Sequence, residues 1–369
     1  MAEVMISLRH VSKRFGADGT PAVRDRSMDV LEGETVVLVG PSGCGKTTTM
    51  RMINRLIEPT SGEILVDGKN VLEQDPVQLR RGIGYVIQSI GLLPHRTVSD
   101  NIATVPQLVG WDRRRTRERV EELAHMLQLD RELLDRYPGE LSGGQRQRVG
   151  VARALAVDPP VMLMDEPFGA VDPIVRGHLQ DQFLEIQDRL RKTIVFVTHD
   201  IDEAIKMADR IAILNLGAVL EQYGTPEEIL REPATPFVEQ FVGTERGLKR
   251  LALMRVADVG VEEGPVVDPH TTVPRALEVM DACGLDWASV VADGRLLGWV
   301  DRDMLRGRRS VGEAAARPFS ARVTTGSSLR QALDSIVRER TNVAVVVAED
   351  GERYLGILTL GRISQEIVS

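Results

Sequence analysis

Cysteine is scarce in this sequence of 369 residues. Only Cys44 and Cys283 are present, and they lie far apart along the chain. Two such residues make neither a disulfide framework nor a four-ligand zinc site. We therefore expect the protein to work in a reducing compartment.

Long apolar runs are also missing. No run approaches the roughly 18 apolar residues that span a bilayer, and the opening stretch carries Glu3 and Arg9 where a signal peptide would be apolar. We expect the chain neither to cross nor to enter a membrane by itself. Positive charge is in deficit, since 46 Lys and Arg face 54 Asp and Glu. This net charge of −8 argues against nucleic acid as the main partner.

What the sequence does contain is typical of a folded protein with more than one domain. Hydrophobic residues make up 43% and charged residues 27%, close to the average for soluble globular proteins. The length predicts two or three domains. Continuous apolar runs, each followed by a turn or a helical pattern, predict buried parallel strands of an α/β sheet. These runs are Val161–Met164 and Ile194–Val197, whereas Val36–Val39 and Glu63–Val66 are short β-type runs between glycine-bearing turns. A helical insertion is expected between residues 113 and 156, and the α/β domain should span residues 1–242.

An internal repeat follows the α/β domain. Thr272–Leu277 corresponds to Ser328–Leu333, and each segment precedes a helix, an Ala/Val-rich strand and a strand opening with glycine, at Gly298 and Gly356. Two βαββ-like units of this size should pack on each other, because neither alone buries a good core. The expected boundaries are a linker at 243–263 and a module at 264–369, with repeats at 264–312 and 313–369.

A phosphate-binding loop is the strongest motif. Gly40-Pro41-Ser42-Gly43-Cys44-Gly45-Lys46-Thr47 follows a predicted strand and precedes a helix, which is the context this motif requires. Its backbone amides should surround phosphates, Lys46 should reach the β- and γ-phosphates, and Thr47 should bind Mg²⁺. The thiol of Cys44 is open to two interpretations: a reactive group at a helix N-terminus or a buried, inert one.

Two carboxylates, Asp165 and Glu166, end the strand that begins at Val161. Adjacent side chains of a strand point to opposite faces, so Asp165 is assigned to the metal and Glu166 to the general base. Further along the chain, Ser142-Gly143-Gly144-Gln145 predicts a capping box at the start of a helix. Two successive glycines there also let amides approach an anion closely.

Together these segments resemble the ATP-binding cassette (ABC) ATPases, whose signature sequence matches residues 141–145. The resemblance implies a P-loop NTPase fold with an antiparallel β subdomain and a helical subdomain at about 89–156. It also implies roles for Gln88, as the Q-loop glutamine and a metal ligand, for Gly169–Asp172, as the D-loop, and for His199, as the switch histidine at the γ-phosphate. Taken alone, His199 would more simply precede a capping box of Asp200 and Glu203.

The same resemblance implies that ATP binds between the phosphate loop of one subunit and the signature of another, so the active unit is a homodimer. The predicted catalytic residues are Glu166, His199 and Gln88, and the predicted metal ligands are Thr47, Gln88 and Asp165. The predicted ATP contacts are Phe15, Gly40 to Thr48, Gln88, Ser142 to Gln145, Asp172 and His199. Phe15 is placed there to stack on adenine, with a place in a β-subdomain core as the alternative.

One segment narrows the resemblance. GYVIQSIGLLPH at Gly84–His95, followed by DNIATVP at Asp100–Pro106, looks like ATPase subunits of quaternary-amine importers for glycine betaine, choline, carnitine or proline betaine. That resemblance implies integral-membrane permease subunits, an extracytoplasmic solute-binding protein and a place on the inner face of the cell membrane. An importer of another solute, such as an amino acid, remains an alternative, because the solute is not expected to touch this subunit. An ABC ATPase outside transport is the other alternative, although such proteins usually have two cassettes or a long coiled-coil insertion.

The repeats resemble a tandem pair of cystathionine-β-synthase (CBS) domains. They depart from adenosine-binding members, since the first repeat is one residue short after Gly298 and the second has Arg362 at the expected Asp position. The regulatory ligand is therefore left open between ionic strength, a cyclic dinucleotide and a purely structural role.

Overall fold

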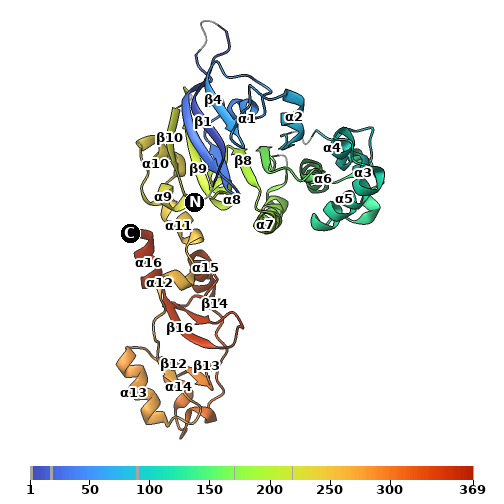
Figure 1. Cartoon of the computed structure of the whole chain (residues 1–369). Coiled ribbons are helices and arrows are strands. Elements are labelled where there is room, and N and C mark those ends of the chain that lie inside the picture. Colours follow the sequence, from blue (N-terminus) through green and yellow to red (C-terminus); the bar gives the residue numbers. More distant parts are fainter. Residues whose placement is uncertain (1–2, 17–19, 89–90, 170, 218, 369) are drawn as a thin grey trace. The chain divides into compact units, whose positions relative to one another are not determined.

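The computed structural model describes residues 3–16, 20–88, 91–169, 171–217 and 219–368. The chain divides into two compact units, Met1–Val242 and Gly243–Ser369. Figure 1 shows the elements of both, and each unit is described by itself.

The first unit is built on a six-stranded sheet with the order β10-β9-β3-β8-β7-β6. Its strands are β3 (Thr35–Val39), β6 (Ile83–Val86), β7 (Val161–Asp165), β8 (Thr193–Thr198), β9 (Arg210–Asn215) and β10 (Val219–Gly224). Only β10 runs antiparallel to its neighbour. Every residue of β3, β7 and β8 is buried, as strands covered on both faces require. The predicted buried parallel strands are confirmed.

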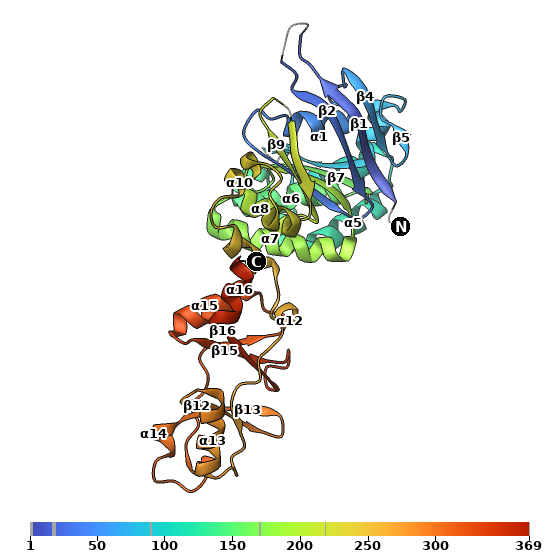
Figure 2. The same cartoon turned by 90° about the vertical axis from the view of Figure 1, so that its left-hand side faces the viewer.

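An antiparallel sheet with the order β2-β1-β4-β5 lies beside the first. It comprises β1 (Val4–Lys13), β2 (Val23–Leu31), β4 (Ser61–Val66) and β5 (Lys69–Asn70), and Figure 2 shows β1, β2 and β4 side by side. Ile6 and Ile64 share one core with Val36 and Leu163 of the parallel sheet. This shared core fixes the antiparallel sheet against the strand that leads into the phosphate loop.

Six helices in the described part of this unit lie outside its helical lobe. They are α1 (Lys46–Ile53), α2 (Pro76–Arg81), α7 (Pro173–Leu190), α8 (Ile201–Met207), α9 (Pro226–Arg231) and α10 (Pro236–Val242). A helical lobe holds α3 (Val98–Ile102), α4 (Thr104–Leu108), α5 (Arg113–Met126), η1 (Arg131–Leu133), η2 (Pro138–Glu140) and α6 (Gly143–Leu155). Val120, Leu123 and Ala124 form the buried face of α5, which lies within the helical insertion expected between residues 113 and 156.

The second unit contains two sheets of the same design, and this confirms the predicted pair of βαββ-like repeats. The first repeat has β11 (Val266–Val267), α13 (Val273–Cys283), β12 (Trp287–Ala292), β13 (Arg295–Asp301), α14 (Arg302–Leu305) and η3 (Val311–Glu313). The second has β14 (Arg322–Thr324), α15 (Leu329–Glu339), β15 (Val343–Val347), β16 (Tyr354–Thr359) and α16 (Leu360–Val368). In both, the central strand pairs parallel to the short strand and antiparallel to the other.

The two repeats exchange backbone pairing. Glu262, which precedes β11, pairs with Ile357 of β16, and Arg317, which precedes β14, pairs with Trp299 of β13. Glycine is required where each segment crosses: a Cβ at Gly298 would lie 2.4 Å from the Arg317 carbonyl oxygen, and one at Gly356 would lie 2.4 Å from the Glu262 carbonyl oxygen. The sequence predicted that each of these glycines is the first residue of its strand. In the structure both lie inside their strands instead.

The expected linker at 243–263 folds instead. It contains α11 (Arg246–Leu253) and α12 (Val256–Val259). Leu251 and Val256 are fully buried in one core with Ile336 and Leu358 of the second repeat. Short helices of this kind gain their stability from tertiary packing rather than from propensity, so the local pattern gave little sign of them. Among the described residues no helix is long and apolar enough to span a bilayer.

Candidate functional site

The phosphate loop connects the buried end of β3 to the first turn of α1. Lys46 is 6% exposed, and its Nζ donates to the carbonyl oxygens of Gly40 at 2.6 Å and Pro41 at 3.0 Å. The Lys46 ammonium, which is predicted to bind phosphate, is therefore bonded to carbonyl groups of its own loop. A phosphate entering the loop would compete with these carbonyl groups for the ammonium. Cys44 is fully buried. This favours the inert interpretation of its thiol over the reactive one.

A buried arginine supports this loop from behind. Arg26 of β2 is 1% exposed and donates to the Thr49 hydroxyl at 2.7 Å, which in turn donates to the Gly45 carbonyl at 2.8 Å. Burial lowers the pKa of Arg26 to about 10, with the Cys44 thiol opposing that shift. Sequence reasoning missed Arg26. The available signal was an arginine at a position of β2 where the alternation calls for an apolar residue.

Thr47 and Asp165 form an oxygen pair at the mouth of the loop. The Thr47 hydroxyl donates to the Asp165 carboxylate at 3.0 Å. Burial raises the pKa of Asp165, while the Thr47 bond and the Arg51 and Lys46 charges oppose it. A bound divalent cation would favour the charged carboxylate. One carboxylate and one hydroxyl, completed by phosphate oxygens, are a set that suits Mg²⁺.

Glu166 lies at the centre of the candidate catalytic group. It follows β7 with a left-handed φ of 45°, and its backbone N–H donates to the Val197 carbonyl of β8 at 2.9 Å. Its carboxylate accepts from the Gln88 amide at 2.9 Å and lies 3.3 Å from His199 Nδ1. Three residues predicted separately from three strand ends thus meet at one carboxylate.

The alternative reading of His199 as a residue before a capping box is only half right. Asp200 caps α8 by accepting from the backbone N–H groups of Asp202 and Glu203. The Glu203 carboxylate instead accepts from the Gln180 amide of α7 at 2.9 Å. No capping box forms here, because tertiary packing against α7 buries Glu203.

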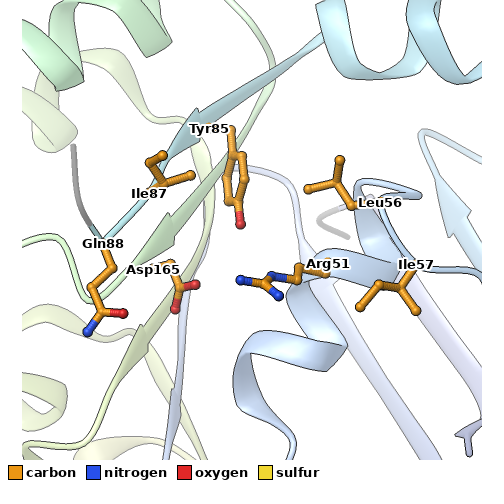
Figure 3. A pocket seen from close by; sticks show the side chains of 7 residues that line it. All are labelled: Arg51, Leu56, Ile57, Tyr85, Ile87, Gln88 and Asp165. Atoms are coloured by element: carbon orange, nitrogen blue, oxygen red, sulfur yellow. The ribbon is translucent and has the colours of Figure 1, made fainter. Parts of the chain in front are cut away.

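A cavity of about 550 Å³ lies beside Asp165. Figure 3 shows Arg51, Tyr85, Gln88 and Asp165 among its lining residues, with the Arg51 guanidinium directed toward Tyr85 and Asp165. Burial raises the pKa of Tyr85, with the Asp165 charge adding to it. Arg51 was not predicted, although it lies four residues after Thr47 in α1, a spacing that places both on one helix face.

The signature segment begins α6. The Ser142 hydroxyl accepts from the Gln145 N–H, and the Gln145 side chain accepts from the Ser142 N–H, so the predicted capping box is confirmed. A Cβ at Gly143 would meet nothing within 4 Å, which leaves the helix start open to a ligand. In the D-loop, Asp172 is exposed, and Ala170 lies outside the described residues.

The remaining predicted contacts lie at the surface or behind the loop. Phe15 is 56% exposed, with Lys13 Nζ 5.2 Å from its ring centroid, so it does not fill a core. Thr48 is partly buried in the first turn of α1. An exposed ring is available for stacking on a planar base.

Comparison with known proteins agrees with this arrangement. The ABC transporter family matches residues 23–169, and the CBS domain family matches residues 315–369. The chain is 47% identical over 360 residues to the glycine betaine/carnitine/choline transport ATP-binding protein OpuCA of Bacillus subtilis, covering 96% of this chain and 94% of that protein. It is also 47% identical over 372 residues to the osmoprotectant import ATP-binding protein OsmV of Salmonella typhimurium, covering 99% and 95%.

A solved dimeric structure of MJ0796, a bacterial ABC transporter cassette, resembles the first unit. The TM-score is 0.55 with 33% sequence identity, and the match covers 60% of this chain and 99% of that one. The predicted fold class, a P-loop ABC cassette followed by a CBS-type region, is confirmed.

Proposed function

This chain belongs to the ATP-binding subunits of ABC transporters, in the group that serves osmoprotectant uptake, and from that premise we propose that it powers the import of quaternary amines. Glycine betaine, choline, carnitine and proline betaine are the proposed solutes. The observation that supports the catalytic part is the convergence of Gln88 and His199 on the Glu166 carboxylate.

The phosphate loop and the predicted catalytic residues each have a place in the proposed hydrolysis. The loop amides and Lys46 bind the phosphates of ATP. Glu166 accepts a proton from the attacking water, the water oxygen bonds to the γ-phosphorus, and the bond to ADP breaks. Gln88 holds the carboxylate on one side, and His199 approaches it from the other, where it would also reach the γ-phosphate.

Magnesium would be held by Thr47 and Asp165, with Gln88 as the third proposed ligand. When bound, it would neutralise charge on the phosphates. The Gln88 amide nitrogen donates to Glu166, and Gln88 lines the same cavity as Asp165; both observations support this proposed role.

A second copy of the chain completes the proposed site. Ser142, Gly143, Gly144 and Gln145 would close over ATP held by the partner's loop, using the open start of α6 and the positive end of its helix dipole. Asp172 would lie at the same interface. The dimer would bind two permease subunits at the inner face of the membrane, and an extracytoplasmic solute-binding protein would deliver the solute.

The test is transport by the chain reconstituted with its permease in vesicles. Radiolabelled glycine betaine, choline, carnitine and proline betaine are compared with a panel of amino acids, with Lys46→Ala as the control lacking ATP binding. Uptake of at least one quaternary amine that depends on ATP and on Lys46 is expected. Uptake of amino acids alone would contradict the proposed solute class, and no ATP-dependent uptake of any solute would contradict the transport role.

A further inference from the structure

The second unit contains a cavity that the ATPase cycle does not use. It has a volume of about 300 Å³, at the small end of ligand-binding cavities. Both repeats contribute to its wall: Leu285, Trp287 and Trp299 come from the first, Phe319 to Ala321 from the segment joining the repeats, and Arg340 to Val343 from the second.

Three aromatic rings form one side of this cavity. Trp287 and Phe319 meet edge to face, with centroids 5.5 Å apart and planes at 75°, and Trp299 and Phe319 are 6.4 Å apart at 47°. The chain has only three tryptophans, so two of them lie here. Rings inclined in this way form a corner rather than a flat slot. A corner suits a rounded quaternary ammonium, which binds to aromatic faces by cation–π attraction.

The charge on the wall is positive. Arg340 ends α15 in a left-handed conformation, with φ of 54°, fixed by its N–H bond to the Val337 carbonyl. Its side chain is exposed and makes no ion pair with any residue in the described ranges. Among the residues that the structure describes, no Asp or Glu lines the cavity. A ligand carboxylate would therefore be the natural partner of this guanidinium.

We propose that this cavity binds a small zwitterion with a quaternary ammonium at one end and a carboxylate at the other, the chemistry of glycine betaine. The ammonium lies among Trp287, Trp299 and Phe319, and the carboxylate lies on Arg340. Trp299 already accepts a cation in this structure, because the Arg317 guanidinium carbon lies 5.6 Å from its ring centroid.

A nucleotide fits this wall less well. A flat base stacks best in a parallel slot, and ribose hydroxyls are commonly bound by a carboxylate, which the wall lacks. The inclined rings and the lone guanidinium match one cation and one anion. Binding of the zwitterion by the second unit is inferred from the cavity alone. A signal from the imported solute to the ATPase would rest in addition on the proposed transport function.

Calorimetric titration of the full chain tests the binding. Glycine betaine is compared with 3,3-dimethylbutyrate, which has the same shape without the positive charge, and with choline, which lacks the carboxylate. Each is expected to bind about tenfold more weakly than glycine betaine, since each loses one of two charged contacts. Indole fluorescence in a Trp111→Phe background reports whether the ligand reaches Trp287 and Trp299.

Variants locate the site. Arg340→Gln should weaken betaine binding about tenfold, while Arg338→Gln, an exposed arginine of the same helix that does not line the cavity, should leave it unchanged. Phe319→Leu should weaken binding, and Trp299→Leu is the second aromatic variant should Phe319→Leu fail to fold.

Several results would overturn the proposal. They are equal binding of glycine betaine and dimethylbutyrate, choline binding as tightly as betaine, no effect of Arg340→Gln, or tight binding of an adenine or cyclic nucleotide in place of betaine. Failure of transport in vesicles with binding intact would contradict the proposed function and leave this site standing.

Discussion

Glu166 shows how closely a single residue in this protein is constrained. Its carboxylate is fixed between the Gln88 amide and the His199 imidazole, and its backbone is bonded to β8. The change Glu166→Gln removes the negative charge and the ability to accept a proton, while the amide keeps nearly the same shape and one oxygen that can accept from Gln88.

We expect Glu166→Gln to keep ATP binding and to reduce hydrolysis by at least about 100-fold, the usual share of a general base. A fluorescent nucleotide titration measures the first and phosphate release the second. Glu118→Gln, on the exposed face of α5, is the matched control. Hydrolysis by Glu166→Gln within a fewfold of the parent rate would remove Glu166 from the role of base.

Most residues of the candidate site could be predicted from the types of residue in the motifs, but the contacts between their side chains could not. The phosphate loop and the paired carboxylates were predictable because each motif lies within one strand and its following turn. Arg26 and Arg51 were not, because their roles depend on which side chains the tertiary fold places opposite them. The burial of Cys44 had the same cause.

At the scale of elements, Asn101 joins α3 to the loop that follows Gln88. It is fully buried. Its amide nitrogen lies within 3.1 Å of the carbonyl oxygens of Leu93, Arg96 and Thr97, and its Oδ1 accepts from the Leu93 N–H at 2.8 Å.

Asn101→Ala should therefore lower the free energy of unfolding by about 2–3 kcal/mol, since buried backbone groups lose their partner. Urea denaturation measures it. Asp100→Asn, one residue earlier and exposed, should cost much less. Equal costs for both variants would show that the buried amide contributes nothing special to the loop.

The contact between α7 and α8 predicts a pH dependence. Burial raises the pKa of Glu203 above its usual 4.5, with bonds from Thr198 and Gln180 opposing. The folded state then holds this proton more tightly than the unfolded state does, so its contribution to stability is present at low pH and is lost as pH rises through the folded pKa.

Glu203→Gln should remove the loss of folding stability that accompanies deprotonation of Glu203 as pH rises. The difference in unfolding free energy between parent and variant should shift in favour of the variant as pH rises from about 4.5 toward neutrality, and then level off. Urea denaturation across this range measures it, with Glu227→Gln, an exposed position of α9, as the control. A parent-minus-variant difference that is constant with pH would contradict the argument.

At the scale of the whole molecule, every residue placed in the catalytic group precedes Val242, and α11 and α12 belong to the second unit's core. A chain ending after Val242 should therefore fold and hydrolyse ATP. A chain ending after Glu263 should be less soluble, because Leu251 and Val256 lose the residues that cover them. Size-exclusion chromatography and phosphate release compare the two. Equal behaviour would mean that α11 and α12 do not need the second repeat.

The end of the first unit at Val242 also separates the part of the fold that could be predicted from the sequence from a segment that could not. The α/β unit was predictable from runs that are apolar throughout, since such strands are buried by their neighbours whatever the details. Residues 243–263 were not, because the partners of Leu251 and Val256 lie near Ile336 and Leu358, too far along the chain for any local pattern to show.

The exchanged pairing has a consequence for how the chain is made. Domains generally fold in order as the chain leaves the ribosome, so the ATP-binding unit can complete itself early. Glu262 pairs with Ile357, and α11 packs with the core that ends at Ile363. The first-synthesised segment of the second unit, which includes Glu262, can therefore complete its contacts only after the last-synthesised segment, which includes Ile357, has been made. A chain truncated within the second unit would contain a complete ATP-binding unit followed by a segment with exposed apolar residues. Quality-control proteases can recognise such a segment.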